Sequence, residues 1–385
     1  MMLSVRDFEV AARAVLDPVY RDFIDGGARD EITVRANEEA FRHLQLLPRV
    51  LCAGASEREL GVTLFGDRAR LPVVLSPTAF HKLVDPEGEL ATVRAAAAEG
   101  AVMIVSMAAT TAVGEIADAA RAVAGDEAVL WFQLYLQPDA GITDVLVRRA
   151  EDAGCRALVI TVDSPVLGAH ERNRRNRFHD LPAGLRCENL RDLRDGETGH
   201  IRQIQMSPEF SWDHLDRLRA KTSLRILLKG VLHPADARLA VQHGVDGLMI
   251  SNHGGRQLDT VPSTVELLPE LAAAVDGAIP LLLDGGVRRG TDVVKALALG
   301  ASAVGIGRPV LWALAEGGEK GVRRLLELLR EEVDDAVALC GASAVTGLTP
   351  ELVRVPSWPI GWGAACRQVP ATPTGDRQRT PGEVP

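Results

Sequence analysis

Eight short apolar runs alternate with helix-like segments along most of this chain, and this rhythm limits the folds that it can adopt. The runs cover residues 73–76, 102–106, 129–134, 158–162, 225–228, 247–250, 280–283 and 303–306. Most are separated by segments rich in alanine and charge, with helical spacing. This alternation is typical of a parallel sheet covered by helices. With eight repeats, the sequence predicts an α/β fold of the (β/α)8 TIM-barrel type rather than an open doubly wound sheet.

The segments before and after the eight runs complete the domain. Residues 4–23 have helical spacing and predict one or two short helices that end near Asp25, before two glycines. Residues 28–70 are mixed and polar, with an extended arm at 44–50, and residues 321–339 predict an amphipathic helix. We therefore expect one barrel domain with N-terminal helices over residues 1–350.

The last part of the chain differs in composition. Residues 351–385 are rich in proline, glycine and polar residues, which predicts a tail that is partly disordered, from about residue 368 onwards. Trp358 and Trp362 are expected either to anchor the start of this tail or to reach a neighbouring subunit.

One connection is much longer than the others. No strand is predicted between residues 164 and 223, after the fourth run, and its first part is dense in arginine. Such a long insertion is often a lid over a functional site, although a solvated charged loop has the same composition.

Charge and cysteine content limit the partners and the compartment. The net charge of −9 argues against nucleic acid or an anionic membrane as the main partner, and no window approaches the length of a membrane span. The five cysteines lie far apart and show no metal-binding spacing. We expect reduced thiols, no metal and a cytoplasmic protein, because the N-terminus lacks an apolar signal segment.

The carboxyl ends of the predicted strands carry polar residues. The active site of an eight-stranded α/β barrel is built from these ends, so the side chains are expected to meet around one cavity. They are, in chain order, Pro77, Thr78, Ala79, Ser106, Gln133, Tyr135, Thr161, Asp163, Lys229, Ser251, His253, Asp284, Gly285, Gly286, Arg288, Gly307 and Arg308.

Within this set, the nine residues from Ser251 to Asp259 hold a histidine and an arginine at one strand end. His253 is followed by two glycines, where the backbone turns freely, and Arg256 has no acid beside it in the sequence. A base and a cation delivered together indicate a site that handles a proton and an anion. The alternative is a histidine that caps the core and a surface arginine.

The last two strand ends are typical of phosphate binding. Gly285, Gly286 and Arg288 follow the seventh strand, and Gly307 and Arg308 follow the eighth, where this barrel often binds phosphate. Lys229 either stabilises an anion on a bound polar ring or pairs with a carboxylate inside the barrel.

These motifs resemble those of the FMN-dependent 2-hydroxy-acid oxidase and dehydrogenase family, which includes glycolate, lactate and hydroxymandelate oxidases and mandelate dehydrogenase. The resemblance covers residues from about 4 to 349, and the Ser-Asn-His-Gly-Gly-Arg-Gln-Leu-Asp string is its most specific part. It implies that FMN is held by the strand-end residues given above, other than Tyr135, Asp163 and His253.

The resemblance also implies the catalytic roles. His253 would take a proton from the α-carbon or the hydroxyl of the substrate, and Asp163 would orient its imidazole. Arg256 would bind the substrate carboxylate, and Tyr135 would hydrogen-bond a substrate oxygen.

Three positions depart from the family pattern and are expected to shape the substrate pocket. Phe23 stands where a tyrosine is usual, His170 where a second arginine is usual, and Ala108 where some members have tryptophan. Phe23 removes a hydroxyl and Ala108 leaves space, which favours a larger, more apolar side chain, such as that of mandelate. His170 either replaces the arginine charge weakly or is a lid residue without a role.

The predicted function is oxidation of an (S)-2-hydroxy acid to a 2-oxo acid, with electrons passed to O2. Another electron acceptor, oxidative decarboxylation, and a specialised natural-product or peptide-derived substrate are alternatives, and a silent flavin-binding scaffold is a fourth. Relatives that are often tetrameric imply a homo-oligomer.

Overall fold

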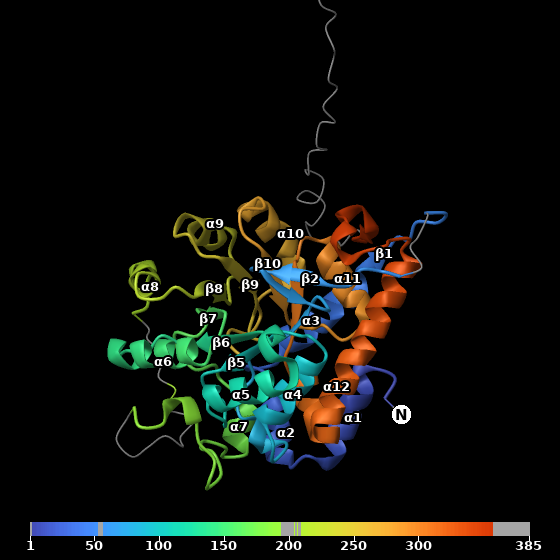
Figure 1. Ribbon diagram of the computed structural model, residues 1–385. Coiled ribbons are helices and arrows are strands. Elements are labelled where there is room, and N and C mark those ends of the chain that lie inside the picture. The colour runs from blue at the N-terminus through green and yellow to red at the C-terminus, as the bar shows by residue number, and fades with distance from the viewer. Residues whose placement is uncertain (1, 53–56, 194–203, 205, 207–208, 357–385) are drawn as a thin grey trace, which may run out of the picture.

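The structure is a computed structural model that describes residues 2–52, 57–193, 204, 206 and 209–356. Eight parallel strands close into a barrel in the order β10-β11-β4-β5-β6-β7-β8-β9 (Figure 1). They are β4 (Val73–Leu75), β5 (Met103–Ser106), β6 (Leu130–Leu134), β7 (Ala157–Thr161), β8 (Arg225–Lys229), β9 (Gly247–Ile250), β10 (Leu281–Asp284) and β11 (Ala303–Ile306). Each strand coincides with a predicted run, so the predicted (β/α)8 barrel is confirmed.

A layer of helices surrounds the barrel. It contains α4 (Glu89–Ala98), α5 (Val113–Ala124), α6 (Ala140–Asp152), α8 (Trp212–Arg219), α9 (Pro234–Gln242), α10 (Thr264–Val275), α11 (Gly290–Ala298) and α12 (Arg308–Leu339). Local sequence sets the start of α10, where Ser263 and Glu266 form a capping box. The helix predicted at 321–339 is the second part of α12, which is interrupted by non-helical backbone at Gly317 and Gly318.

Side chains of the barrel strands alternate between the interior and the helix layer, as strand geometry requires. One buried apolar cluster fills the interior and includes Val74, Ile104, Trp131, Val159, Leu227, Met249, Leu282 and Ala303. Two residues after each of these comes Ser76, Ser106, Gln133, Thr161, Lys229, Ser251, Asp284 or Gly305. The interior therefore changes from apolar to polar towards the carboxyl ends of the strands.

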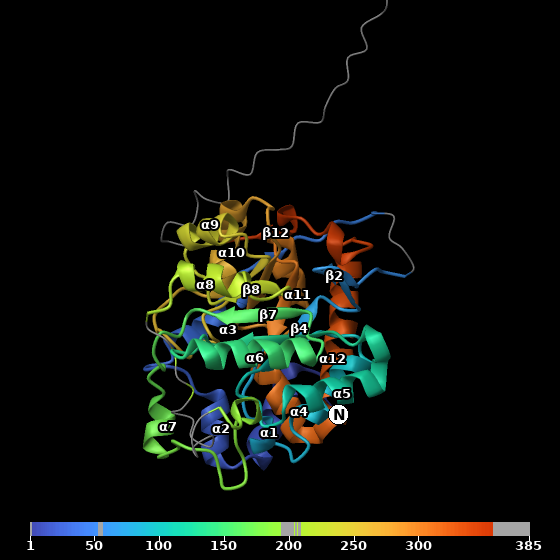
Figure 2. The ribbon, with the colours of Figure 1, turned by 60° about the vertical axis from the view of Figure 1, so that its left-hand side comes forward.

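A hairpin closes the opposite end of the barrel. β2 (Val62–Leu64) pairs with β3 (Asp67–Ala69), and Leu64 is only 1% exposed. The Phe65 ring lies 5.4 Å from the Trp131 ring, edge to face, and covers Gly247, where a Cβ atom would lie 2.6 Å from Phe65. The two views place β2 at one end of the barrel and the helices α2 (Pro18–Asp25) and α7 (Glu171–Arg175) at the other (Figures 1 and 2).

The N-terminal region contains one helix more than predicted. α1 (Val5–Val15) and α2 (Pro18–Asp25) were expected, but α3 (Ile32–His43) falls in the segment interpreted as mixed and polar. α3 has no side-chain cap of its own. Instead Asp259, 226 residues away, accepts a hydrogen bond of 2.8 Å from the backbone N–H of Thr33, a partner that local sequence does not reveal.

The extended arm expected at 44–50 is reduced to the two residues of β1 (Gln45–Leu46). β1 pairs antiparallel with β12 (Val353–Arg354), so the chain is still joined to the domain beyond the expected boundary at residue 350. Trp358, Trp362 and the disorder expected from about residue 368 lie outside the described residues.

The long insertion after β7 contains a short helix, α7 (Glu171–Arg175), in addition to the barrel helix α8. The helix α7 packs against α2. Arg172 of α7 forms ion pairs with Asp22 of α2 (3.5 Å) and with Glu31, which directly precedes α3 (2.5 Å). Within the described segments, no helix is long and apolar enough to cross a membrane.

The β2–β3 hairpin, which closes the amino-terminal end of the barrel, should contribute to stability and not to catalysis. Truncating the buried Leu64 to alanine removes apolar contacts and leaves a cavity, so Leu64→Ala should lower the free energy of unfolding by about 2–5 kcal/mol. Denaturant titration measures this effect. Leu339→Ala removes the same atoms from a side chain that is 76% exposed and should change stability little. Equal effects of the two variants would contradict the role given to the hairpin.

Candidate active site

A cavity of about 410 Å³ opens at the carboxyl ends of the barrel strands. Every residue predicted to hold FMN lines it except Ser251, which is fully buried behind Lys229. Tyr135, His253, Arg256, Phe23, Ala108 and His170 line it as well, and Asp163 lies behind His253. The structure therefore brings the predicted site residues together around one cavity.

His253 forms a chain of contacts with Asp163 and Tyr135. Its Nδ1 lies 2.9 Å from Asp163 Oδ1, and its Nε2 lies 3.4 Å from the Tyr135 hydroxyl. An ionised carboxylate only accepts hydrogen bonds, so Nδ1 carries the proton and Nε2 presents its lone pair towards the cavity. This arrangement makes His253 a base that faces the cavity.

The electrostatics support these protonation states. Burial on its own would raise the pKa of Asp163, but its interaction with His253, the charge of Lys229 and the hydrogen bond from Ser164 lower this pKa below its ordinary value. Burial and the Asp163 charge raise the pKa of Tyr135 above its ordinary value. At neutral pH the carboxylate is therefore ionised, and the phenol keeps its proton as a donor.

The backbone at the end of β9 aims the imidazole. His253 adopts φ +57°, in the left-handed region that few residues other than glycine occupy. Its N–H donates to Ser251 Oγ at 3.1 Å, and Lys229 Nζ donates to the same oxygen at 3.1 Å. The buried Ser251 thus fixes the turn that presents His253, instead of lining the cavity.

Arg256 reaches the cavity from the same loop and is held by main-chain oxygens. Its Nη1 donates to the carbonyls of Phe23 (2.8 Å) and Gly26 (2.7 Å), and its guanidinium lies 5.2 Å from the centre of the Phe23 ring. Burial lowers the pKa of Arg256 to about 10, so it stays charged at neutral pH. Among the described residues, its Nη2 has no hydrogen-bond partner, which leaves a donor for an anion.

His170 does not replace the charge of an arginine. Burial and the charge of Arg256 lower the pKa of His170 to about 3, so its imidazole is neutral at neutral pH. Its Nε2 lies 2.8 Å from the carbonyl oxygen of Arg256 and donates to it. His170 therefore has a structural contact that neither sequence interpretation anticipated: it holds the backbone that carries Arg256.

The polar ends of the strands form two connected groups. Ser106 Oγ donates to Gln133 Oε1 at 3.1 Å, and Gln133 Nε2 donates to Thr161 Oγ1 at 3.1 Å. On the other side, Lys229 Nζ lies 3.8 Å from Asp284 Oδ2. Lys229 therefore has the nearby carboxylate that one sequence interpretation expected, and it also lines the cavity; stabilisation of an anion on a bound ring stays a prediction.

A family model for FMN-dependent dehydrogenases matches residues 12–355. The chain belongs to this family. It is 42% identical to human 2-hydroxyacid oxidase 1 over 92% of this chain and 96% of that protein, and 43% identical to L-lactate oxidase from Nostoc over 92% and 98%. A solved structure of a mandelate oxidase variant with (S)-mandelic acid is 41% identical, with a TM-score of 0.83 over 92% and 98% of the two chains.

The cavity fits the FMN on which this family depends. Two buried atoms of cavity-lining residues, Asp284 Oδ1 and Arg288 Nε, have no hydrogen-bond partner within the described structure. The first is an acceptor that suits a ribityl hydroxyl, and the second is a donor that suits a phosphate or carbonyl oxygen. The backbone of Gly285, Gly286 and Gly307, beside the N-terminus of α12, would hold the phosphate.

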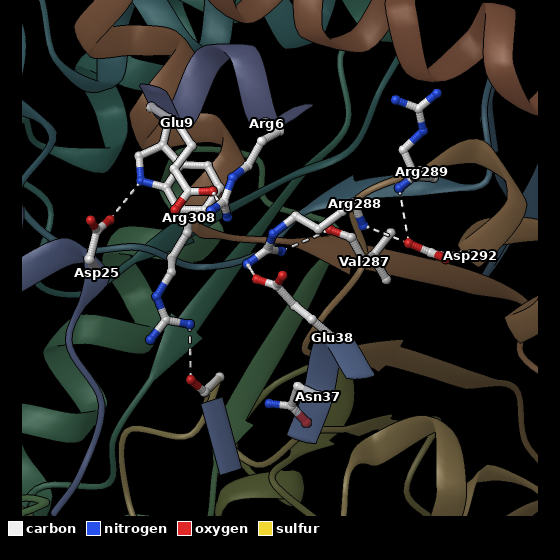
Figure 3. A network of polar contacts seen from close by, with 12 residues as sticks. Arg6, Glu9, Asp25, Asn37, Glu38, Val287, Arg288, Arg289, Asp292 and Arg308 are labelled. Carbon is white, nitrogen blue, oxygen red and sulfur yellow. Dashed lines mark hydrogen bonds and ion pairs between the residues drawn. The ribbon is translucent and has the colours of Figure 1, made fainter. Parts of the chain in front are cut away.

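The two arginines near the phosphate end, Arg288 and Arg308, are held in place by several contacts. Figure 3 shows Arg288 between Glu38 and the carbonyl of Val287, at distances of 3.1 and 2.8 Å. Arg308 donates to the carbonyls of Ile24, Gly254 and Gly26 at 2.9–3.0 Å. Burial lowers the pKa of Arg308 to about 9, so the positive charge persists at neutral pH. Over the described segments, no group of three or more His, Cys, Asp or Glu residues has the arrangement of a metal site.

Several cavity residues were not predicted. Ser76 lines the cavity and donates to Asp284 Oδ2 at 3.2 Å; the alternation of inward residues in the first strand was a signal that would have identified it. Phe80, Arg174 and Phe178 also line the cavity. They lie on loops and a short helix without a strand-like period, so only the folded structure reveals them.

The neutral His170 should make stability depend on pH. Its pKa is near 3 when folded and near 6.5 when unfolded, so the unfolded chain binds the extra proton between these values, and stability is lost as the pH falls below 6.5. Between pH 7 and pH 5 the unchanged protein should lose about 1–2 kcal/mol more unfolding free energy than His170→Gln. Denaturant titrations at the two pH values measure this difference, and identical losses would contradict the neutral imidazole.

Proposed function

We propose that this protein oxidises (S)-2-hydroxy acids with an aryl side chain, of the mandelate type, and passes the electrons to O2. Family membership and the 2-hydroxy-acid oxidases among its relatives establish the chemistry of the group as FMN-dependent oxidation of 2-hydroxy acids. We add two points to this: the preference for a substrate with an aryl side chain, and O2 as the electron acceptor.

An aromatic wall beside the catalytic residues carries the proposal. Phe23, Phe80 and Phe178 all line the cavity, with the Phe23 ring 5.8 Å from Phe80 and 5.3 Å from Phe178. Ala108 adds no bulk beyond its Cβ, and Phe23 offers no hydroxyl. An aromatic ring packs well against such a surface through edge-to-face and offset contacts. The similarity to mandelate oxidase structures points the same way.

The substrate carboxylate has one cation that suits it. Arg256 combines a charge at neutral pH with an unused Nη2, and it lies in the same loop as His253. The planar guanidinium binds a carboxylate with directed hydrogen bonds, and its Nη1 contacts with Phe23 and Gly26 hold it in place. The Tyr135 hydroxyl, protonated and 3.4 Å from His253 Nε2, would donate to an oxygen of the substrate.

His253 would remove the proton that must leave, from the α-carbon or from the hydroxyl oxygen. Its Nε2 lone pair faces the cavity, and the Asp163 carboxylate at 2.9 Å stabilises the imidazolium that forms. FMN, when bound, takes up the electron pair that the substrate loses. The overall reaction balances as RCH(OH)COO⁻ + O2 → RCOCOO⁻ + H2O2. The expected homo-oligomeric state and cytoplasmic location stay predictions.

Substrate preference tests the proposal. With purified FMN-loaded protein, kcat/KM for (S)-mandelate should exceed that for glycolate by about 10–100-fold, because a phenyl ring buries apolar surface that glycolate lacks. An oxygen electrode combined with product analysis measures the rate and separates oxidase, dehydrogenase and decarboxylating reactions. A higher kcat/KM for glycolate would overturn the aryl preference, and oxidation without O2 uptake would overturn the acceptor.

A second test addresses the base. His253→Gln should lower the rate of flavin bleaching by mandelate under anaerobic conditions by about 10²–10⁴-fold, since glutamine accepts no proton. His243→Gln is a matched control, because His243 Nδ1 also lies 2.9 Å from a carboxylate, that of Asp216, but His243 does not line the cavity. Bleaching at the normal rate in His253→Gln would exclude His253 as the base.

A further inference from the structure

The rim of the cavity carries a positive charge that the reaction does not use. His170 precedes α7 and Arg174 lies four residues later, so the two side chains share one face of this helical turn. Both residues line the cavity. The neutral His170 contacts the Arg256 backbone, so of these two residues Arg174, one turn farther along, is the one that carries a formal charge.

Arg174 differs from the arginines beside it. Arg172 pairs with Glu31 and Asp22, and Arg175 pairs with Glu171 at 2.7 Å. The side chain of Arg174 is exposed and makes no hydrogen bond or ion pair with any described residue. An unpaired guanidinium at the edge of a cavity attracts anions and can bind them with directed hydrogen bonds.

The other cations of the cavity already have tasks. Arg256 suits the 2-hydroxy carboxylate, Arg288 and Arg308 lie at the phosphate end, and Lys229 lies inside the barrel near Asp284. Of the described residues that line the cavity, Asp284 alone is acidic. Arg174 is therefore a positive charge available for a second anionic group.

The same segment supplies an apolar surface next to this charge. Phe178 donates its backbone N–H to the carbonyl of Asn173 at 2.9 Å, which folds the chain back onto α7, and its ring packs against Phe23. A ligand that extends from Arg256 along these rings would end near residues of α7. A substrate with an aromatic ring and an anionic group at the far end of that ring would place the ring against Phe23 and Phe178 and the anion near Arg174.

We propose that Arg174 is a specificity-determining residue that binds a second anion, so that the preferred substrates are aryl 2-hydroxy acids with a carboxylate at the far end of the ring. The inference rests on the proposed function, because Arg256 and the aromatic wall must hold the rest of the molecule. It adds a contact outside the set that holds the 2-hydroxy carboxylate.

The test compares (S)-mandelate with its 4-carboxy derivative in the FMN-loaded protein. The derivative should have the higher kcat/KM, and Arg174→Gln should reduce its advantage by about fivefold, the size of a partly exposed ion pair, while leaving mandelate unchanged. Arg177→Gln is the matched control, because Arg177 is exposed in the same segment and does not line the cavity. Added salt should weaken the advantage in the unchanged protein only.

Binding of the two 2-oxo acids, benzoylformate and its 4-carboxy derivative, provides a second measurement through changes in flavin absorbance. The ratio of their dissociation constants should shift in Arg174→Gln by the same factor as kcat/KM. Equal affinity of the unchanged protein for both compounds, or an equal loss for both in Arg174→Gln, would overturn the role of Arg174. If the protein oxidises neither (S)-mandelate nor its 4-carboxy derivative, the proposed function fails. The ratio of the two dissociation constants for the 2-oxo acids still tests the role of Arg174 separately.

Discussion

The alternation of side chains in the closed barrel is the constraint on which the site depends. Once Trp131 points into the barrel, Gln133 must point inward as well, and the same holds for Leu227 and Lys229. Closure then brings eight such positions from distant parts of the chain around one axis. Because the hairpin seals the other end with Leu64 and Phe65, the polar end is the one that opens into a cavity.

The loop after β9 performs two tasks with adjacent residues. His253 and Arg256 face the cavity, whereas Asn252 exchanges two amide hydrogen bonds of 2.9 and 2.7 Å with Asn37 of α3. A Cβ atom at Gly255 would lie 2.7 Å from the backbone nitrogen of Val34, and one at Gly286 only 2.1 Å from the carbonyl oxygen of Asn37. These glycines therefore also allow α3 to pack closely against the two loops.

Electrostatics separate the charged groups of the cavity by role. Arg256 and Arg308 keep their charge at neutral pH, because burial lowers their pKa values only to about 10 and about 9. Main-chain carbonyl oxygens accept hydrogen bonds from both guanidinium groups. His170 loses its charge in the same surroundings because an imidazole releases its proton far more readily than a guanidinium. Because histidine stands here where the family usually has arginine, position 170 carries no charge beside Arg256. The charge of Arg174 remains at the rim of the cavity.

The sequence by itself determined the barrel, its eight strands and most of the residues around the cavity, because strand patterns and strand-end motifs are local. It did not reveal α3, whose cap Asp259 and partner Asn252 lie more than 200 residues away. It also left the role of His170 open, since the pKa depends on burial and on the charge of Arg256. Only the tertiary structure placed Phe80, Phe178 and Arg174 at the cavity, because contacts between loops follow from packing in three dimensions and leave no periodic pattern along the chain.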